Sequence, residues 1–219
     1  QYETVRLISS GDTVPETSDP AKTFQMVGIP DGLGAHKGSK GQRIVYVSHE
    51  LGFAVESEPV LGRPLNRGAF VSRLVLDAAG EVESGERAYD TVYLDDTLVG
   101  PAAEVGNTTR GFARFCGGSL AGPAQGFDRP IYFANEEEGS PANSFDGKGG
   151  LSVAIFDGEA HALTDLGHFA WENTLVQPGT GKRTVIMGME DGPNVLDRTK
   201  ENSQLYMYVG EKDRSQGAS

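Results

Sequence analysis

Three segments of the chain share one design, and this design constrains the fold more than any other feature. Each begins with a basic residue, continues through a short apolar run and ends in a carboxylate close to a glycine: Arg43–Gly52, Arg129–Gly139 and Arg183–Gly192. Apolar runs of this length between turn residues are typical of buried β-strands. Carboxylates repel one another, so strand ends that converge on one place need a counter-charge, and a hard cation is the usual one. The sequence therefore predicts a β-fold with acidic strand ends gathered around a metal ion.

The composition favours an all-β fold. The 219 residues include 30 glycines and 11 prolines, a content typical of short strands joined by tight turns. No stretch of a dozen residues repeats apolar positions at i, i+3 and i+4, so long helices are not expected. The clearest hairpin is Leu151–Leu163, in which Asp157 and Gly158 occupy the turn.

The same signals predict the other elements. A first strand is expected at Thr4–Ile8, a turn at Pro30–Gly34 and a loop over residues 95–111. Further strands are expected at Phe24–Ile29, Ile44–Val47, Phe70–Asp77, Ile131–Phe133, Thr184–Met187 and Leu205–Val209.

Repeated short strands with acidic ends predict a β-propeller. The acidic ends at Glu50, Glu137 and Glu190 are separated by about two blades and about one blade, if a blade takes roughly 40–50 residues. Residues 1–219 would then form a partial propeller domain with about four blades' worth of strands. A β-sandwich is the alternative architecture, since the number of strands alone does not exclude it.

The charge and the single cysteine exclude several classes of protein. A formal net charge of −12 argues against nucleic acid as a partner, because phosphate backbones require a basic face. No apolar stretch is long enough to span a membrane, and the only cysteine, Cys116, excludes an internal disulfide. The chain starts at Gln1 rather than Met, which indicates removal of a leader or a tag. We therefore expect a secreted protein, periplasmic or extracellular.

No nucleophilic triad is visible in the sequence. Ser48 and His49 are adjacent and cannot form one, and no Gly-x-Ser-x-Gly elbow exists. Catalytic residues therefore stay unassigned, and any hydrolysis would rely on metal-bound water or on polarisation of the substrate. His49 is expected to pack inside the protein rather than bind metal, because successive strand residues point to opposite faces and Glu50 is its neighbour.

Several short blocks follow one another along the chain, from about residue 24 to its end. They are Gly28–Ala35, Val47–Glu50, Phe115–Gly118, Asn135–Glu137, Gly167–Glu172, Met189–Asp191 and Gln204–Gly210. In this order the blocks resemble motifs of the PhoX-type alkaline phosphatases and their propeller relatives. The sequence departs from the family at Ser48, where Asn is usual, at Trp171, where His is frequent, and at Ser119–Gly126, which replaces a Thr-Pro-Trp-Gly-Thr segment.

The resemblance implies a six-bladed propeller whose axial site holds iron and calcium and hydrolyses small phosphomonoesters. It implies that Cys116 is a thiolate ligand to iron and that Glu50, Glu137 and Glu172 are carboxylate ligands. Further candidate ligands are Asp31, Glu136, Glu190 and Asp191. Two alternatives stay open, a non-enzymatic calcium-binding propeller for adhesion or binding, and a calcium-dependent lactonase or esterase.

The chain is too short for a complete six-bladed ring. Residues 210–219 carry no apolar anchor and are typical of an exposed connection. We therefore expect a second polypeptide, the downstream half of the same precursor, to complete the fold. This association should be non-covalent, because Cys116 is the only thiol.

Overall fold

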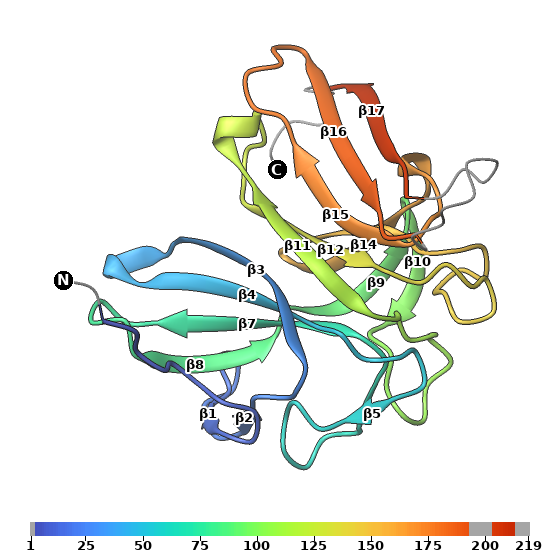
Figure 1. The fold of residues 1–219 in the computed structure, drawn as a ribbon. Coiled ribbons are helices and arrows are strands. Elements are labelled where there is room, and N and C mark those ends of the chain that lie inside the picture. Colours follow the sequence, from blue (N-terminus) through green and yellow to red (C-terminus); the bar gives the residue numbers. More distant parts are fainter. Residues whose placement is uncertain (1–2, 193–202, 213–219) are drawn as a thin grey trace.

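The computed structural model describes residues 3–192 and 203–212, and the described chain is all-β (Figure 1). Helical structure is limited to three short 3₁₀ turns, Ser39–Gly41, Pro123–Gln125 and Thr164–Leu166. Three larger sheets and two small ones contain the strands, and none of these sheets closes on itself. The prediction of an all-β fold is confirmed.

The first sheet is a four-stranded antiparallel meander. Its strands, in spatial order, are β3 (Pro30–Lys37), β4 (Arg43–His49), β7 (Phe70–Leu76) and β8 (Val82–Arg87). The segment at the start of the described chain covers its outer face through β1 (Thr13–Pro15) and β2 (Thr23–Gln25). There Phe24 and Met26 pack on Val47, Leu74 and Leu76. Both faces of β7 are therefore buried, which explains why this strand is almost continuously apolar.

The second sheet has six strands and lies in the middle of the molecule (Figure 1). In spatial order these are β10 (Thr97–Pro101), β9 (Tyr89–Leu94), β14 (Gly158–Leu163), β13 (Ser152–Phe156), β12 (Ile131–Glu136) and β11 (Phe115–Ala121). All neighbours pair antiparallel except β9 and β14, which are parallel. The predicted hairpin is confirmed as β13 and β14, with Asp157 and Gly158 both at positive φ in the turn.

The third sheet has three antiparallel strands, and two very short strands form a separate pair. The third sheet consists of β15 (Trp171–Val176), β16 (Arg183–Glu190) and β17 (Leu205–Glu211). The short pair is β5 (Glu56–Ser57) and β6 (Asn66–Arg67). Because β17 continues to Glu211, the expected connection at 210–219 begins later than predicted, and its part from residue 213 lies outside the described residues.

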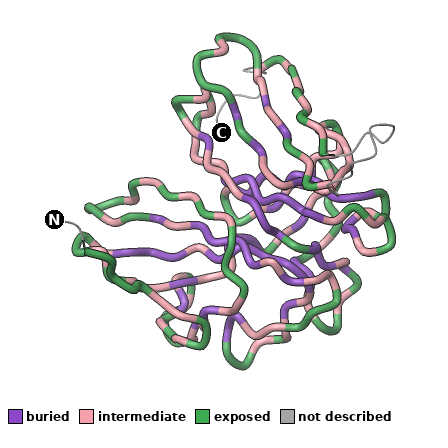
Figure 2. Tube along the Cα trace, viewed as in Figure 1, coloured by how far each residue is buried: buried purple, intermediate pink, exposed green. Residues whose placement is uncertain are grey.

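The three main sheets stack side by side, with the apolar core between them (Figure 2). Strand β11, at one edge of the second sheet, contacts the edge strand β3 of the first sheet and the edge strand β15 of the third, so it lies between them. Alternation along β12 fills both interfaces. Tyr132 belongs to the cluster between the first and second sheets, and the next residue, Phe133, belongs to the cluster between the second and third.

Three predicted elements are wrong. Thr4–Ile8 forms no strand. Pro30–Gly34 is the start of strand β3 and not a turn. Its glycines are needed for close packing rather than for a turn, since a Cβ on Gly34 would lie 2.8 Å from the Tyr132 ring. Within the expected loop 95–111, residues Thr97–Pro101 form strand β10. Most of its side chains are exposed, so the strand lacks the alternation of apolar and polar residues by which a half-buried strand is recognised.

Among the described residues, none belongs to a helix that is long and apolar enough to cross a bilayer. This agrees with the sequence-based expectation of no membrane-spanning helix.

Candidate metal centre

Three hairpins, one in each main sheet, end with the same backbone arrangement. In each, the two strands of the hairpin face each other at an equivalent pair: Pro30 with His49, Phe115 with Glu136, and Trp171 with Glu190. Directly after each pair the register shifts on the first strand. Irregularities of this kind re-aim a side chain out of the regular alternation.

The residue that follows each member of these pairs is a candidate ligand. The first hairpin supplies Asp31 and Glu50, the second Cys116 and Glu137, and the third Glu172 and Asp191. The backbone repeats as well. The amide N–H groups of Glu50, Glu137 and Asp191 donate to the carbonyl oxygens of Ile29, Arg114 and Ala170, each at 3.0 Å. In each hairpin, the backbone of the acidic residue is therefore bonded to the residue that directly precedes the paired residue of the first strand.

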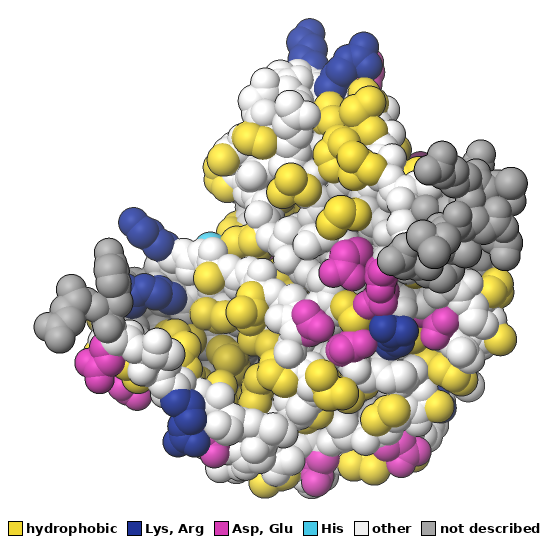
Figure 3. All heavy atoms as spheres, in the orientation of Figure 1, with side chains coloured by type: hydrophobic (Ala, Val, Ile, Leu, Met, Phe, Trp, Pro, Cys, Tyr) yellow, Lys and Arg dark blue, Asp and Glu magenta, His cyan; other side chains and the backbone are white. Residues whose placement is uncertain are grey.

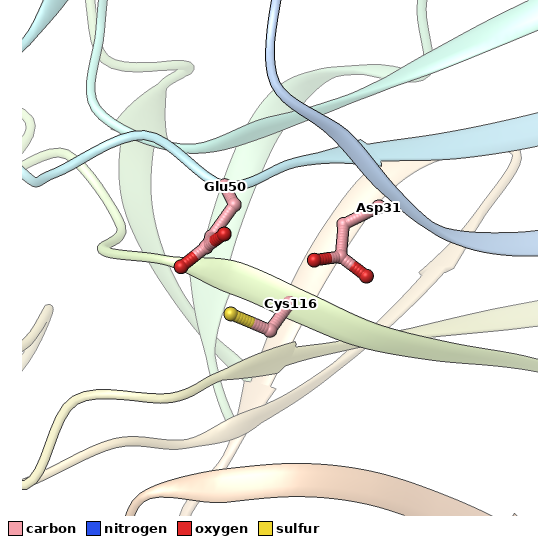
Figure 4. Close-up of side chains that lie close together, drawn as sticks. All are labelled: Asp31, Glu50 and Cys116. Carbon is pink, nitrogen blue, oxygen red and sulfur yellow. The ribbon is translucent and has the colours of Figure 1, made fainter.

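The six side chains converge in two groups. Asp31, Glu50 and Cys116 form one group, and their ligand atoms lie within 4.8 Å of one another (Figure 4). Glu137, Glu172 and Asp191 form the other group, within the same distance. Cys116, in the first group, is close enough to Glu137 of the second group for that carboxylate to raise the pKa of its thiol, so the two groups adjoin. We call the six residues together the acidic centre.

Glycines allow the inner strands to approach closely enough for this convergence. A Cβ on Gly117 would lie 1.6 Å from the Glu172 carbonyl oxygen, and one on Gly32 would lie 2.4 Å from the Gly118 amide nitrogen. Neither position could carry a side chain without moving backbone. The Cys-Gly-Gly sequence therefore holds β3, β11 and β15 in contact beside the ligands.

Arg114 is the basic residue at the acidic centre. Its Nε lies 3.3 Å from Glu50 Oε1 and its Nη2 lies 2.9 Å from Glu137 Oε1, so it joins the first hairpin to the second. On the face shown in Figure 3, acidic side chains gather close to a basic one. Five carboxylates and a thiol thus meet a single guanidinium among the described residues, which leaves an excess of negative charge if the carboxylates are ionised.

The pKa values show that this excess is unfavourable in the absence of a cation. Burial and the charge of Glu50 raise the pKa of Asp31. Burial, followed by Asp191 and the other acidic neighbours, raises the pKa of Glu172. Burial and the Glu137 and Glu50 carboxylates raise the pKa of the Cys116 thiol far above its ordinary value. A bound cation would reverse each of these effects, because it favours the ionised form of every donor.

Two predicted ligands lie outside the acidic centre. Glu136 is fully buried and its Oε1 accepts hydrogen bonds from the backbone N–H groups of Ala113 and Phe145, both at 2.9 Å. Burial raises its pKa to about 8. Glu190 Oε2 accepts bonds from the Gln204 N–H and the Tyr206 hydroxyl, both at 3.3 Å. Both residues directly precede a centre residue on a strand, so alternation turns them to the opposite side.

His49 packs inside the protein, as expected. It is fully buried and stacks on Phe70 with 4.3 Å between ring centroids. Its Nδ1 donates to the Gly28 carbonyl at 3.1 Å, and its Nε2 therefore accepts from the Ser72 hydroxyl at 2.8 Å.

Sequence reasoning missed Arg114 and the pairing of ligands within each hairpin. The carboxylates that end the second strands were visible as a repeated pattern, but their partners on the first strands carry no shared residue type. The position of Asp31, Cys116 and Glu172 could have revealed the pairing. Each lies near the start of a strand whose hairpin partner ends in a carboxylate.

No protein-family model matches the chain, and no curated protein or solved structure matches it either.

Proposed function

We propose that the acidic centre binds metal cations. The observation that carries this proposal is the threefold repeat, in which each hairpin contributes two donor side chains to one place. Carboxylates this close together are stabilised by a cation, and the raised pKa values of Asp31 and Glu172 indicate that one guanidinium does not suffice.

The donor set fits calcium and iron. Carboxylate oxygens suit calcium, whereas the Cys116 sulfur suits a softer ion such as iron. Cys116 would be a ligand only as the thiolate, and a metal ion supplies the charge that its surroundings lack. Calcium held by the carboxylates and iron held in part by Cys116 are therefore the cofactors we propose.

The reaction we propose is metal-dependent hydrolysis of small phosphomonoesters, of the PhoX type, in a secreted protein. Bound cations would supply Lewis acidity to a phosphoryl oxygen. The chain's own residues would hold those cations and hold the substrate against them. The resemblance of the blocks from Gly28–Ala35 to Gln204–Gly210 to those of PhoX-type phosphatases favours this reaction over a calcium-binding protein without activity and over a lactonase or esterase.

We also propose that the sheets are blades of a propeller. One edge strand of each main sheet, β3, β11 and β15, lies at the acidic centre, as inner strands do around a propeller axis. The second sheet exceeds one blade, because β9 and β10 extend its outer edge. The meander of β11 to β14 is the blade in this interpretation.

A second polypeptide, the downstream half of the same precursor, would continue the ring from the third sheet. The outward face of that sheet is apolar, and we call it the open face. Its large exposed or half-exposed side chains are Leu175, Met187, Met189, Leu205, Met207 and Val209. Leu175, Met187 and Met207 face one another in a single cross-strand row. The first sheet, by contrast, has its outer face covered by Phe24 and Met26.

The occupant we propose for the open face is a β-sheet with an apolar face. The second and third sheets already pack in this way through Phe133, Val176 and Ile186, and the open face offers the next layer of the same stack. Native mass spectrometry of the protein from its source should detect a second polypeptide. A monodisperse particle of 23.3 kDa would contradict the proposal, and a dimer of this chain would show that a second copy covers the face instead.

The activity is tested with p-nitrophenyl phosphate, with and without a chelator, on protein whose metals have been measured. Chelator-sensitive turnover by protein that contains calcium and iron is the expected result. Calcium without turnover of the phosphoester would favour a calcium-binding protein or a lactonase. No turnover by intact, metal-loaded protein would refute the proposed phosphatase.

A further inference from the structure

The backbone at Arg114 is held in an unusual conformation from three directions. Its φ is +48°, in the left-handed region that residues other than glycine seldom adopt. The Arg114 N–H donates to the Leu51 carbonyl at 2.8 Å. Its own carbonyl oxygen accepts from Cys116 N–H at 2.8 Å and from Glu137 N–H at 3.0 Å. The conformation therefore fixes Arg114 beside three residues of the acidic centre or their direct neighbours, and such strained positions are frequent at functional sites.

The side chain of Arg114 occupies the place of a cation. It contacts Glu50 and Glu137, one carboxylate from each of the two groups, through different nitrogen atoms. These are two of the oxygens that a metal ion would need. The Arg114 side chain is 45% exposed, so it can leave this place without breaking an apolar core.

We infer that Arg114 has two roles. In the metal-free protein it is the counter-cation of Glu50 and Glu137, and when metal ions bind these carboxylates it is displaced and binds the phosphoryl group of a substrate. This inference rests on the proposed metal site. A metal ion bound to Glu50 and Glu137 repels the guanidinium and removes its partners. The released guanidinium is tethered next to the centre, and its planar fork of N–H donors matches a phosphoryl group.

The first test compares calcium affinity of the metal-free wild type with that of Arg114→Gln by calorimetry. Loss of the competing cation should tighten calcium binding about three- to tenfold, the range expected for two half-exposed ion pairs. Arg129→Gln is the matched control, because Arg129 also joins two carboxylates, Asp128 and Asp157, and is 38% exposed. This control should bind calcium as the wild type does.

The second test measures binding of inorganic phosphate to the calcium-loaded proteins. Arg114→Gln should bind phosphate at least about tenfold more weakly, and Arg114→Lys, which keeps the charge but not the fork, should fall between. If Arg114 only supported the structure, Arg114→Gln would instead weaken calcium binding in the first test, because the acidic centre would lose its shape.

The outcomes separate this inference from the proposed function. Calcium binding that Arg114→Gln leaves unchanged or weakens overturns the role of Arg114 alone, as does unchanged phosphate binding. A wild type that binds no calcium overturns both. If Arg114→Gln fails to fold, Arg114→Lys keeps the inference testable, because its calcium affinity should stay close to that of the wild type while its phosphate affinity falls.

Discussion

Acidification should destabilise this protein through one buried histidine, His49. Both imidazole nitrogens are engaged, with Nδ1 donating to Gly28 and Nε2 accepting from Ser72. A second proton on the ring would place a charge in the core, and the Ser72 hydroxyl would have to turn and accept from Nε2 instead of donating to it. Burial accordingly lowers the pKa of His49 from 6.5 to about 4.

The sign and size of the effect follow from this pKa. Between pH 6.5 and 4 the unfolded chain binds a proton at His49 and the folded protein does not, so the free energy of unfolding falls as the pH falls. At about 1.4 kcal/mol for each pH unit, the loss attributable to His49 is about 3 kcal/mol at pH 4. This is a large share of the stability of an ordinary domain.

The assay is urea unfolding of the wild type and His49→Gln at a series of pH values, with a chelator present so that metal binding at the neighbouring Glu50 does not contribute. The variant should be less stable at pH 7 by about 1–3 kcal/mol, because it loses part of the hydrogen bonding. That difference should shrink by about 3 kcal/mol on going to pH 4. Parallel stability curves for the two proteins would refute the reasoning, as would an imidazole resonance of His49 that titrates near 6.5.

Three further predictions concern the centre and the open face. Gly117→Ala should lower the free energy of unfolding in urea by at least about 3 kcal/mol, because the added Cβ would overlap the Glu172 carbonyl oxygen. Gly52→Ala should cost far less, because its Cβ would lie 3.6 Å from the Val55 side chain, an ordinary van der Waals contact. Glu137→Gln should weaken calcium binding about tenfold or more in a calorimetric titration, whereas Glu138→Gln should not. Met207→Lys should abolish assembly with a second polypeptide in native mass spectrometry while circular dichroism stays unchanged; retained assembly would exclude the open face.

Local patterns predicted the elements whose residues decide their own conformation. The Asp157-Gly158 turn and the alternating strands around it are examples, because both central residues of such a turn need positive φ. Strand β3 could not be predicted in this way. Its glycines face the Tyr132 ring and the backbone of β11, contacts between residues far apart in the sequence.

The candidate site was predictable only in part for the same reason. The strand-end carboxylates Glu50, Glu137 and Asp191 follow apolar runs, so their position could be inferred. Which of two adjacent acids faces the centre depends on the register. Glu137 and Asp191 belong to the acidic centre, whereas their neighbours Glu136 and Glu190 lie outside it. The role of Arg114 depends on packing between two hairpins and has no local signal.

The most direct test of the central claim is a measurement of calcium and iron in the purified native protein by elemental analysis. The wild type should retain both metals in stoichiometric amounts after dialysis against metal-free buffer. A variant with Glu50 and Glu137 both changed to Gln should lose bound metal while keeping the β-sheet circular dichroism of the wild type. A folded wild type that holds neither metal, and takes up neither when they are added, would contradict the account.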